Sequence, residues 1–379
     1  MRETNRISNH FQKDRLKIAR MAKGLTQTSL AEALGFSRQY MHQVEIGDRT
    51  PNAESIEAFA DLLDVTPYFF ERPVQHLVTS DEVNFRKQKT TKLQFENKVI
   101  AMSSLLREVA GEISNDIAMP DVKLTQAEFT DIKSIEDAAQ LVRKELGLGV
   151  NSPIDSVTRV LEVCGVICVN ADNIPEKISA LSVDLDRPLV IHNSLNEQLT
   201  RTRYDLSHEL AHLVGHRGIT TGDDETERQA DKFASFFLIS SAAFRANCPL
   251  RGRGKINWSA MKEFKQEWKI SYKAIVRRAH DMGLIDAVTY KNALIQLSAA
   301  GYSKREPDEP DGDENPKLIH NAIAAMQNVF DIYLEEMMSK IGIKPAFLEA
   351  LLGVAIEDKP NLENVVMLSK YKVEKRTAS

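Results

Sequence analysis

The chain has 379 residues, of which 42% are hydrophobic and 27% charged, and its formal net charge is −5. This length is typical of two or three domains, and the hydrophobic content is enough to build buried cores. The charge excludes an overall basic protein, although a small basic surface can still exist within an acidic whole.

Three cysteines, Cys164, Cys168 and Cys248, are too few for a disulfide framework and favour a reducing compartment. No stretch approaches the roughly 18 apolar residues of a membrane helix, and the N-terminus lacks the apolar core of a signal peptide. We therefore expect a cytoplasmic protein without a membrane partner.

Residues 11–72 predict five short helices with the spacing of a helix-turn-helix. Thr26 is a good N-cap for the second helix, Gly35 makes the tight turn, and Ser37 caps a third helix that Gly47 ends. A helix, a glycine turn and a second capped helix form the usual DNA-binding arrangement. The alternative is a five-helix protein-interaction module.

The amino-acid sequence of this segment closely resembles the Cro/phage-repressor (XRE-type) helix-turn-helix family. The matching positions are Leu25-Thr26-Gln27, Leu30-Ala31, Gly35, Ser37, Glu45, Gly47 and Pro51. The resemblance implies that the third helix lies in the major groove of a double-stranded DNA operator. It also implies that five side chains point outward to bases or phosphates, namely Arg38, Gln39, Tyr40, His42 and Gln43.

The side-chain chemistry and the local charge fit this interpretation. Arginine can bind guanine and glutamine can bind adenine through paired hydrogen bonds. Gln27, at the start of the second helix, is expected to contact a phosphate. Residues 1–40 hold eight basic and three acidic side chains, a net of +5, whereas residues 41–73 hold two and seven, a net of −5. The basic half contains the surface expected to meet DNA. We expect the protein to be associated with the nucleoid when it is bound to DNA.

Residues 74–133 are interpreted as a connector. The stretch 84–89 is basic and polar, and residues 93–117 then carry apolar side chains at the spacing of a long amphipathic helix. Two interpretations of this helix stay open. It packs on the next domain, or it forms a homodimer, which would suit a module that reads paired half-sites.

A small sheet is predicted before residues 207–212, which form the central motif of the chain. Helices are expected over residues 134–145 and 154–164, and strands over residues 166–169, 178–183 and 189–191. In many zinc peptidases such a sheet precedes the metal-binding helix, and its edge holds an extended peptide by strand addition.

The central motif is Ser207-His208-Glu209-Leu210-Ala211-His212, which contains His-Glu-x-x-His. Histidines at i and i+4 share one helix face, close enough for both rings to reach one Zn²⁺. Glu209 would face a water on the metal and take its proton during attack on a carbonyl. The alternative is a surface helix that carries two histidines by chance.

Two histidines leave a zinc site incomplete, so a third protein ligand is needed. His216 lies about 12 Å along the axis from the first histidine, so a straight helix cannot bring it to the same ion. It is expected to brace the helix end. Glu227, on the buried face of a helix over 226–238, is the preferred ligand, with Glu225 as its rival. Asp231 is expected to orient a ligand histidine.

The string SHELAHLVGH, followed by Glu227-x-x-Ala230-x-x-Phe233-Ala234, resembles the ImmA/IrrE family of metallo-endopeptidases. The resemblance covers about residues 134–300, but the string FFLISSAAF departs from the usual end of the ligand helix. It implies a gluzincin-like site with His208, His212 and Glu227 on zinc and Glu209 as the catalytic carboxylate. It also implies DNA-bound repressor proteins of the helix-turn-helix type as substrates.

Residues 250–305 are predicted to be helical and to buttress the peptidase domain, which we place at 134–303. Residues 304–316 are interpreted as a Pro/Asp/Glu-rich linker, and 317–358 as a C-terminal helical region. The predicted fold class is mainly α with a small β-sheet (α+β): a helix-turn-helix domain, a long linking helix, a zincin-like domain and the C-terminal helices.

These predictions combine into a DNA-binding regulator with a zinc endopeptidase domain. It would cut a repressor-type protein, itself or a partner, when a signal arrives, and so derepress phage-, mobile-element- or stress-related genes. Arg203, Tyr204 and His216 are further donors for the oxyanion. The alternative is a transcription factor whose peptidase-like domain senses a ligand or partner without cleaving, or acts as an antitoxin-type regulator.

Overall fold

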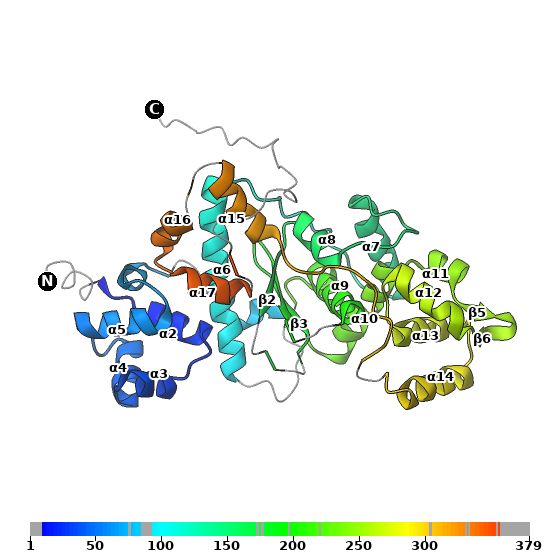
Figure 1. Ribbon diagram of the computed structural model, residues 1–379, viewed down its shortest axis with the longest axis horizontal. Coiled ribbons are helices and arrows are strands. Elements are labelled where there is room, and N and C mark those ends of the chain that lie inside the picture. Colours follow the sequence, from blue (N-terminus) through cyan, green and yellow to red (C-terminus); the bar gives the residue numbers. More distant parts are fainter. Residues whose placement is uncertain are drawn as a thin grey trace.

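The computed structural model describes residues 10–356, apart from 75–76, 85–92, 172–173, 176–177, 196–197, 220, 303–304, 330–331, 333 and 354. The protein is mainly helical with a small mixed sheet, as the sequence predicts. The helix-turn-helix lies at one end, the sheet in the middle and helices α11–α14 at the other end (Figure 1). Among the described residues, no helix has both the length and the apolar content needed to cross a bilayer.

The N-terminal domain contains the helices that the capping residues predict. Thr26 accepts a hydrogen bond from the Ser29 amide, Ser37 accepts one from Tyr40, and Gly47 ends the recognition helix with a φ of 88°. Its last element is a 3-10 turn rather than an α-helix. The elements are α2 (Lys13–Ala22), α3 (Gln27–Leu34), α4 (Arg38–Ile46), α5 (Ala53–Leu63) and η1 (Pro67–Glu71).

Helix α6 (Leu93–Asp116) runs through the centre of the molecule (Figure 1). It packs on α2, on α15 (Leu318–Val329) and on α16 (Leu334–Ile341). The apolar side chains of its predicted stripe are all buried within this single chain: Phe95, Val99, Met102, Leu105, Leu106, Val109 and Ile113. The stripe is therefore an internal packing surface. Of the two open interpretations, the homodimer therefore loses its support, because the apolar stripe is already covered by the same chain.

The four-stranded sheet has the order β1-β3-β4-β2. Strands β2 and β4 are parallel, whereas β3 runs antiparallel to both of its neighbours, β1 and β4. Three of these four strands are predicted from the sequence, and the first is not. Their bounds are β1 (Val83–Asn84), β2 (Ile167–Ala171), β3 (Ala180–Val183) and β4 (Leu189–Asn193).

The sheet separates two hydrophobic cores because successive side chains point to opposite faces. One face contributes Leu181 and Ile191 to a core shared with α6 and the helix-turn-helix. The other face contributes Cys168 and Val190 to the core of the domain that contains the His-Glu-x-x-His motif. That second core is formed largely by α7 (Ile132–Glu145), α8 (Val157–Val163), α9 (Leu199–Gly215) and α10 (Asp224–Leu238).

Helix α7 begins earlier than predicted. Its N-cap is Asp131, which accepts a hydrogen bond from the Ser134 amide, so Ser134 is the third residue of the helix and not its start. Beyond α10, the chain forms a helical buttress with a short hairpin. It comprises α11 (Ser241–Asn247), β5 (Leu250–Arg251), η3 (Gly252–Gly254), β6 (Lys255–Ile256), α12 (Trp258–Trp268), α13 (Tyr272–Asp281) and α14 (Ala287–Ala299).

The acidic segment predicted as a linker is part of the folded structure. We call residues 305–316 the acidic strap. Its carboxylates accept hydrogen bonds from backbone amides in the first turns of three helices, where the helix dipole favours negative charge. Glu306 caps α13, Glu309 caps α9 and Glu314 caps α8.

The C-terminal helices pack back onto the first half of the chain. Helix α17 (Pro345–Leu352) covers β2, and a β-bridge joins Val65 to Ile343. The Thr66 amide donates to the Gly342 carbonyl at 2.7 Å. The C-terminal region is therefore attached directly to the helix-turn-helix domain.

Candidate metal centre and DNA-binding surface

Three side chains converge between α9 and α10. The Nε2 atoms of His208 and His212 are 3.2 Å apart, because residues at i and i+4 share one helix face. The Glu227 carboxylate reaches them from α10, with oxygens 3.5 Å from His208 Nε2 and 3.7 Å from His212 Nε2. One donor atom from each residue fits within a mutual distance of 4.8 Å.

This donor set fits a zinc ion. Two nitrogens bound tetrahedrally at about 2.0–2.1 Å would lie roughly 3.3 Å apart, close to the separation of the two ring nitrogens. The position also favours positive charge. Burial lowers the pKa of His208, but hydrogen bonds to Asp231 and Glu227 outweigh it and raise that pKa to about 10. A bound cation would take the place of this proton.

A second layer of contacts holds the two histidines. The Oδ1 atom of Asp231 lies 3.0 Å from the Nδ1 atom of His208. His216 Nδ1 lies 2.9 Å from His212 Nδ1, and its Nε2 lies 2.9 Å from the Gln229 amide oxygen. If His212 binds a metal through Nε2, its Nδ1–H donates to His216, whose Nε2–H then donates to Gln229.

His216 therefore has the bracing position that the helix geometry predicts, and burial lowers its pKa. The contribution of Gln229 was missed because an amide two residues after Glu227 gives no signal in the sequence. The rival carboxylate, Glu225, is exposed and pairs with Arg228 at 2.6 Å.

Glu209 lies on the side of α9 that faces β3. Glu209 is only 6% exposed, and one of its carboxylate oxygens, Oε2, has no hydrogen-bond partner among the residues that the structure describes. Burial raises the pKa of Glu209 to about 7, against the opposing effects of His208 and of a hydrogen bond from Ser182. A carboxylate with this pKa can accept and return a proton near neutral pH.

The prediction that Arg203 is an oxyanion donor is wrong. Its side chain is fully buried, where it pairs with Glu314 at 2.6 Å and donates to the carbonyls of Ile154 and Asp155. Those groups belong to the region around α8, so the guanidinium is occupied in packing. The Tyr204 hydroxyl donates to the Asp231 carbonyl at 3.3 Å, which ties α9 to α10.

The recognition helix α4 exposes Arg38, Gln39 and His42, as predicted, and it buries Met41 and Val44 in the core. Tyr40 differs from the prediction. Its hydroxyl donates to Ser55 at 3.1 Å, and its ring packs against Phe36. Gln43 is half-buried. The polar side chains free to meet a major groove are therefore fewer than the sequence suggested.

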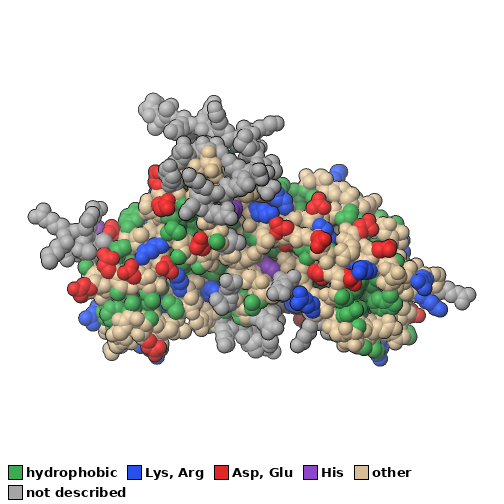
Figure 2. Space-filling view, in the orientation of Figure 1, with side chains coloured by type: hydrophobic (Ala, Val, Ile, Leu, Met, Phe, Trp, Pro, Cys, Tyr) green, Lys and Arg blue, Asp and Glu red, His purple; other side chains and the backbone are tan. Residues whose placement is uncertain are grey.

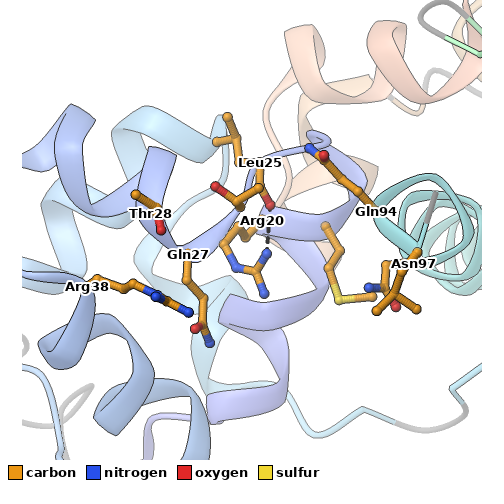
Figure 3. A pocket seen from close by; sticks show the side chains of 10 residues that line it. Arg20, Leu25, Gln27, Thr28, Arg38, Gln94 and Asn97 are labelled. Carbon is orange, nitrogen blue, oxygen red and sulfur yellow. Dashed lines mark hydrogen bonds between the residues drawn. The ribbon is translucent and has the colours of Figure 1, made fainter.

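Gln27 is engaged within the domain, since its amide donates to Glu45 at 2.7 Å and Glu45 is paired with Arg20 at 2.5 Å. A groove of about 470 Å³ opens beside this network (Figure 3). Its lining includes Gln27 and Arg38 on one side and, unexpectedly, Gln94 and Asn97 of α6 on the other. Acidic and basic side chains alternate over the broad face of the molecule in Figure 2.

Comparison with known proteins separates two regions. Residues 14–68 match the family model of a helix-turn-helix domain, and residues 168–280 match that of the IrrE N-terminal-like domain. The uncharacterized HTH-type transcriptional regulator YazB of Bacillus subtilis (strain 168) is 38% identical over 52 residues, which cover 14% of this chain and 75% of that protein. The chain therefore belongs to the XRE-type helix-turn-helix transcriptional regulators and carries an ImmA/IrrE-type peptidase-like domain C-terminal to its DNA-binding module.

Proposed function

We propose that this regulator is a zinc-dependent endopeptidase, with His208, His212 and Glu227 as ligands. The observation that carries the proposal is the convergence of these three donors within 4.8 Å, next to the buried carboxylate of Glu209. A bound zinc would polarise the peptide carbonyl and lower the pKa of an attacking water.

The residues of the chain divide the remaining work. Glu209 accepts the proton of the attacking water and returns it to the leaving amine. Asp231 and His216 hold the two imidazoles in the tautomer and orientation that leave Nε2 free for the metal. Strand β3, which packs against α9, orients an extended peptide by strand addition.

The substrate we propose is a repressor-type protein, a partner or the chain itself. Because the same chain carries a DNA-binding module, cleavage would act on proteins gathered at an operator. A protein that binds zinc but never cuts such a substrate would instead be a sensor of a ligand or partner.

Zinc titration tests the ligand set. The full chain is expected to bind one zinc, and Glu227→Gln to weaken binding by at least about a hundredfold, more than loss of a supporting contact costs. The measurement is competition with a chelator, with metal content determined by mass spectrometry. Glu225→Gln is the matched control on the same helix, because that carboxylate is exposed and paired with Arg228. Equal losses in both variants, or no zinc in the wild type, would refute the site.

DNA binding tests the recognition helix. Arg38→Ala together with Gln39→Ala is expected to abolish specific operator binding, since each paired contact to a base contributes about 1–3 kcal/mol. Operators are selected from random DNA with the wild type and then measured by fluorescence anisotropy. Lys17→Ala, which removes an exposed charge on α2, is expected to retain sequence preference. Unchanged specificity in the double variant would contradict the proposed DNA contacts.

A further inference from the structure

Three residues of the connector that follows the DNA-binding domain, 82–84, lie along the outer edge of the four-stranded sheet. We call Glu82–Asn84 the connector strand. Val83 pairs with Val183 and Asn84 with Ser182, and the Asp184 amide donates to the Glu82 carbonyl at 2.7 Å. The edge of β3 thus already holds an antiparallel segment of the same chain. An edge of this kind is where an extended peptide adds as a further strand.

This edge lies beside the candidate catalytic carboxylate. Val83 and Val183 both belong to the core shared with α6. The next pair in the antiparallel register, Asn84 and Ser182, therefore faces the opposite side of the sheet, toward α9. Ser182 is close enough to Glu209 to form a hydrogen bond with it. The Ser182 hydroxyl therefore stands between the connector strand and Glu209.

The side chain of Asn84 is held by two hydroxyl groups. Its Nδ2 donates to Ser182 Oγ at 3.1 Å, and its Oδ1 accepts from Thr221 Oγ1 at 3.0 Å. Thr221, in the loop between α9 and α10, is only 6% exposed. With both ends of the carboxamide bonded, the position is a subsite for an amide side chain. A carboxylate there could not donate to Ser182, whose own proton is directed to Glu209.

We propose that the connector strand is the resident occupant of the peptide-binding edge of β3, and that a substrate peptide must displace it. The displaced and incoming segments would compete for the Ser182–Thr221 subsite, which favours a carboxamide side chain. The inference rests on the proposed peptidase function, because it identifies this edge as the one that binds substrate.

The occupant is also close to the DNA-binding domain along the chain. Arg15 of α2 donates to the carbonyls of Arg72 and Pro73 at 2.9 and 3.0 Å, about ten residues before the connector strand. Arg15 also pairs with Glu108 of α6 at 2.9 Å. Release of the strand would therefore occur on a short segment whose start is fixed to the helix-turn-helix.

A binding experiment tests the occupancy without requiring turnover. The probe is a fluorescent peptide with the sequence of residues 79–89. The proteins are the full chain without zinc, which keeps the Glu209 carboxylate and cannot hydrolyse the probe, with and without Asn84→Asp. Fluorescence anisotropy is expected to show at least tenfold tighter binding to the protein with the altered connector strand. The probe carrying Asn84→Asp itself is expected to bind that protein at least tenfold more weakly than the unaltered probe.

Asp81→Asn, an exposed change just before the strand, is the matched control and should leave the affinity unchanged. Operator binding and thermal melting report whether Asn84→Asp folds, and Asn84→Ala, which removes both hydrogen bonds without adding charge, is the second variant. Equal affinity of all the folded proteins for the probe would overturn the proposal. Self-cleavage of zinc-loaded wild type within residues 85–92 would also overturn it, by making the connector a substrate. A chain that binds the probe as expected but never hydrolyses a peptide would refute the peptidase function alone.

Discussion

Replacing Glu209 with glutamine is expected to lower peptide hydrolysis by roughly 10²- to 10⁴-fold while zinc and operator binding persist. Positioned proton transfer contributes about this much to a reaction rate, and the amide keeps the size of the side chain but cannot accept the proton of water. The assay is mass-spectrometric detection of fragments from repressor-type proteins and peptides incubated with the zinc-loaded full chain.

Glu225→Gln is the appropriate comparison, because it makes the same chemical change on an exposed carboxylate of the neighbouring helix. It is expected to cut at the wild-type rate. Hydrolysis that continues unchanged in Glu209→Gln would mean that another group handles the proton, and it would remove the central catalytic assignment.

Replacing Glu314 with alanine is expected to destabilise the protein by about 3–5 kcal/mol. Arg203 is fully buried, and removal of its carboxylate partner leaves an uncompensated charge inside the protein. The amides of Val157 and Thr158 at the start of α8 would lose their acceptor as well. The measurement is the free energy of unfolding from urea denaturation followed by circular dichroism.

Asp311→Asn, an exposed substitution in the same acidic strap, is expected to change that free energy by less than about 0.5 kcal/mol. Replacing Arg203 and Glu314 together with apolar residues should cost less than Glu314→Ala alone, because no charge remains unpaired. A loss below about 1 kcal/mol in Glu314→Ala would show that Arg203 finds water or another partner.

Features set by neighbouring residues could be predicted from the sequence. The caps at Thr26 and Ser37 depend on amides three positions away, and the approach of His208 to His212 depends only on helical periodicity. The position of Asp231 followed from Glu227 in the same way, since both residues lie on one helix one turn apart.

Features set by contacts between distant segments could not be predicted. Strand β1 has two residues, too few for an alternating pattern, and it exists because β3 offers an edge. Arg203 is predicted to be a donor to the site because it lies five residues before His208. Its actual partner, Glu314, is 111 positions away, and no pattern near Arg203 in the sequence indicates that pairing. The acidic strap is predicted to be a linker because its composition, rich in Pro, Asp and Glu, is typical of one. Composition does not indicate whether the carboxylates are solvated or accept hydrogen bonds from helix amides.

The shared core on the α6 side of the sheet has a consequence for folding cooperativity. It joins the apolar side chains of the helix-turn-helix, α6, one sheet face and the C-terminal helices into one cluster. Those segments are expected to unfold as one cooperative unit, while the core between the sheet and α10 is a second unit. The boundary between the two units passes through the sheet itself, so it does not coincide with the boundary between the two family matches. Loss of the last helices would therefore loosen DNA recognition before it loosened the metal centre.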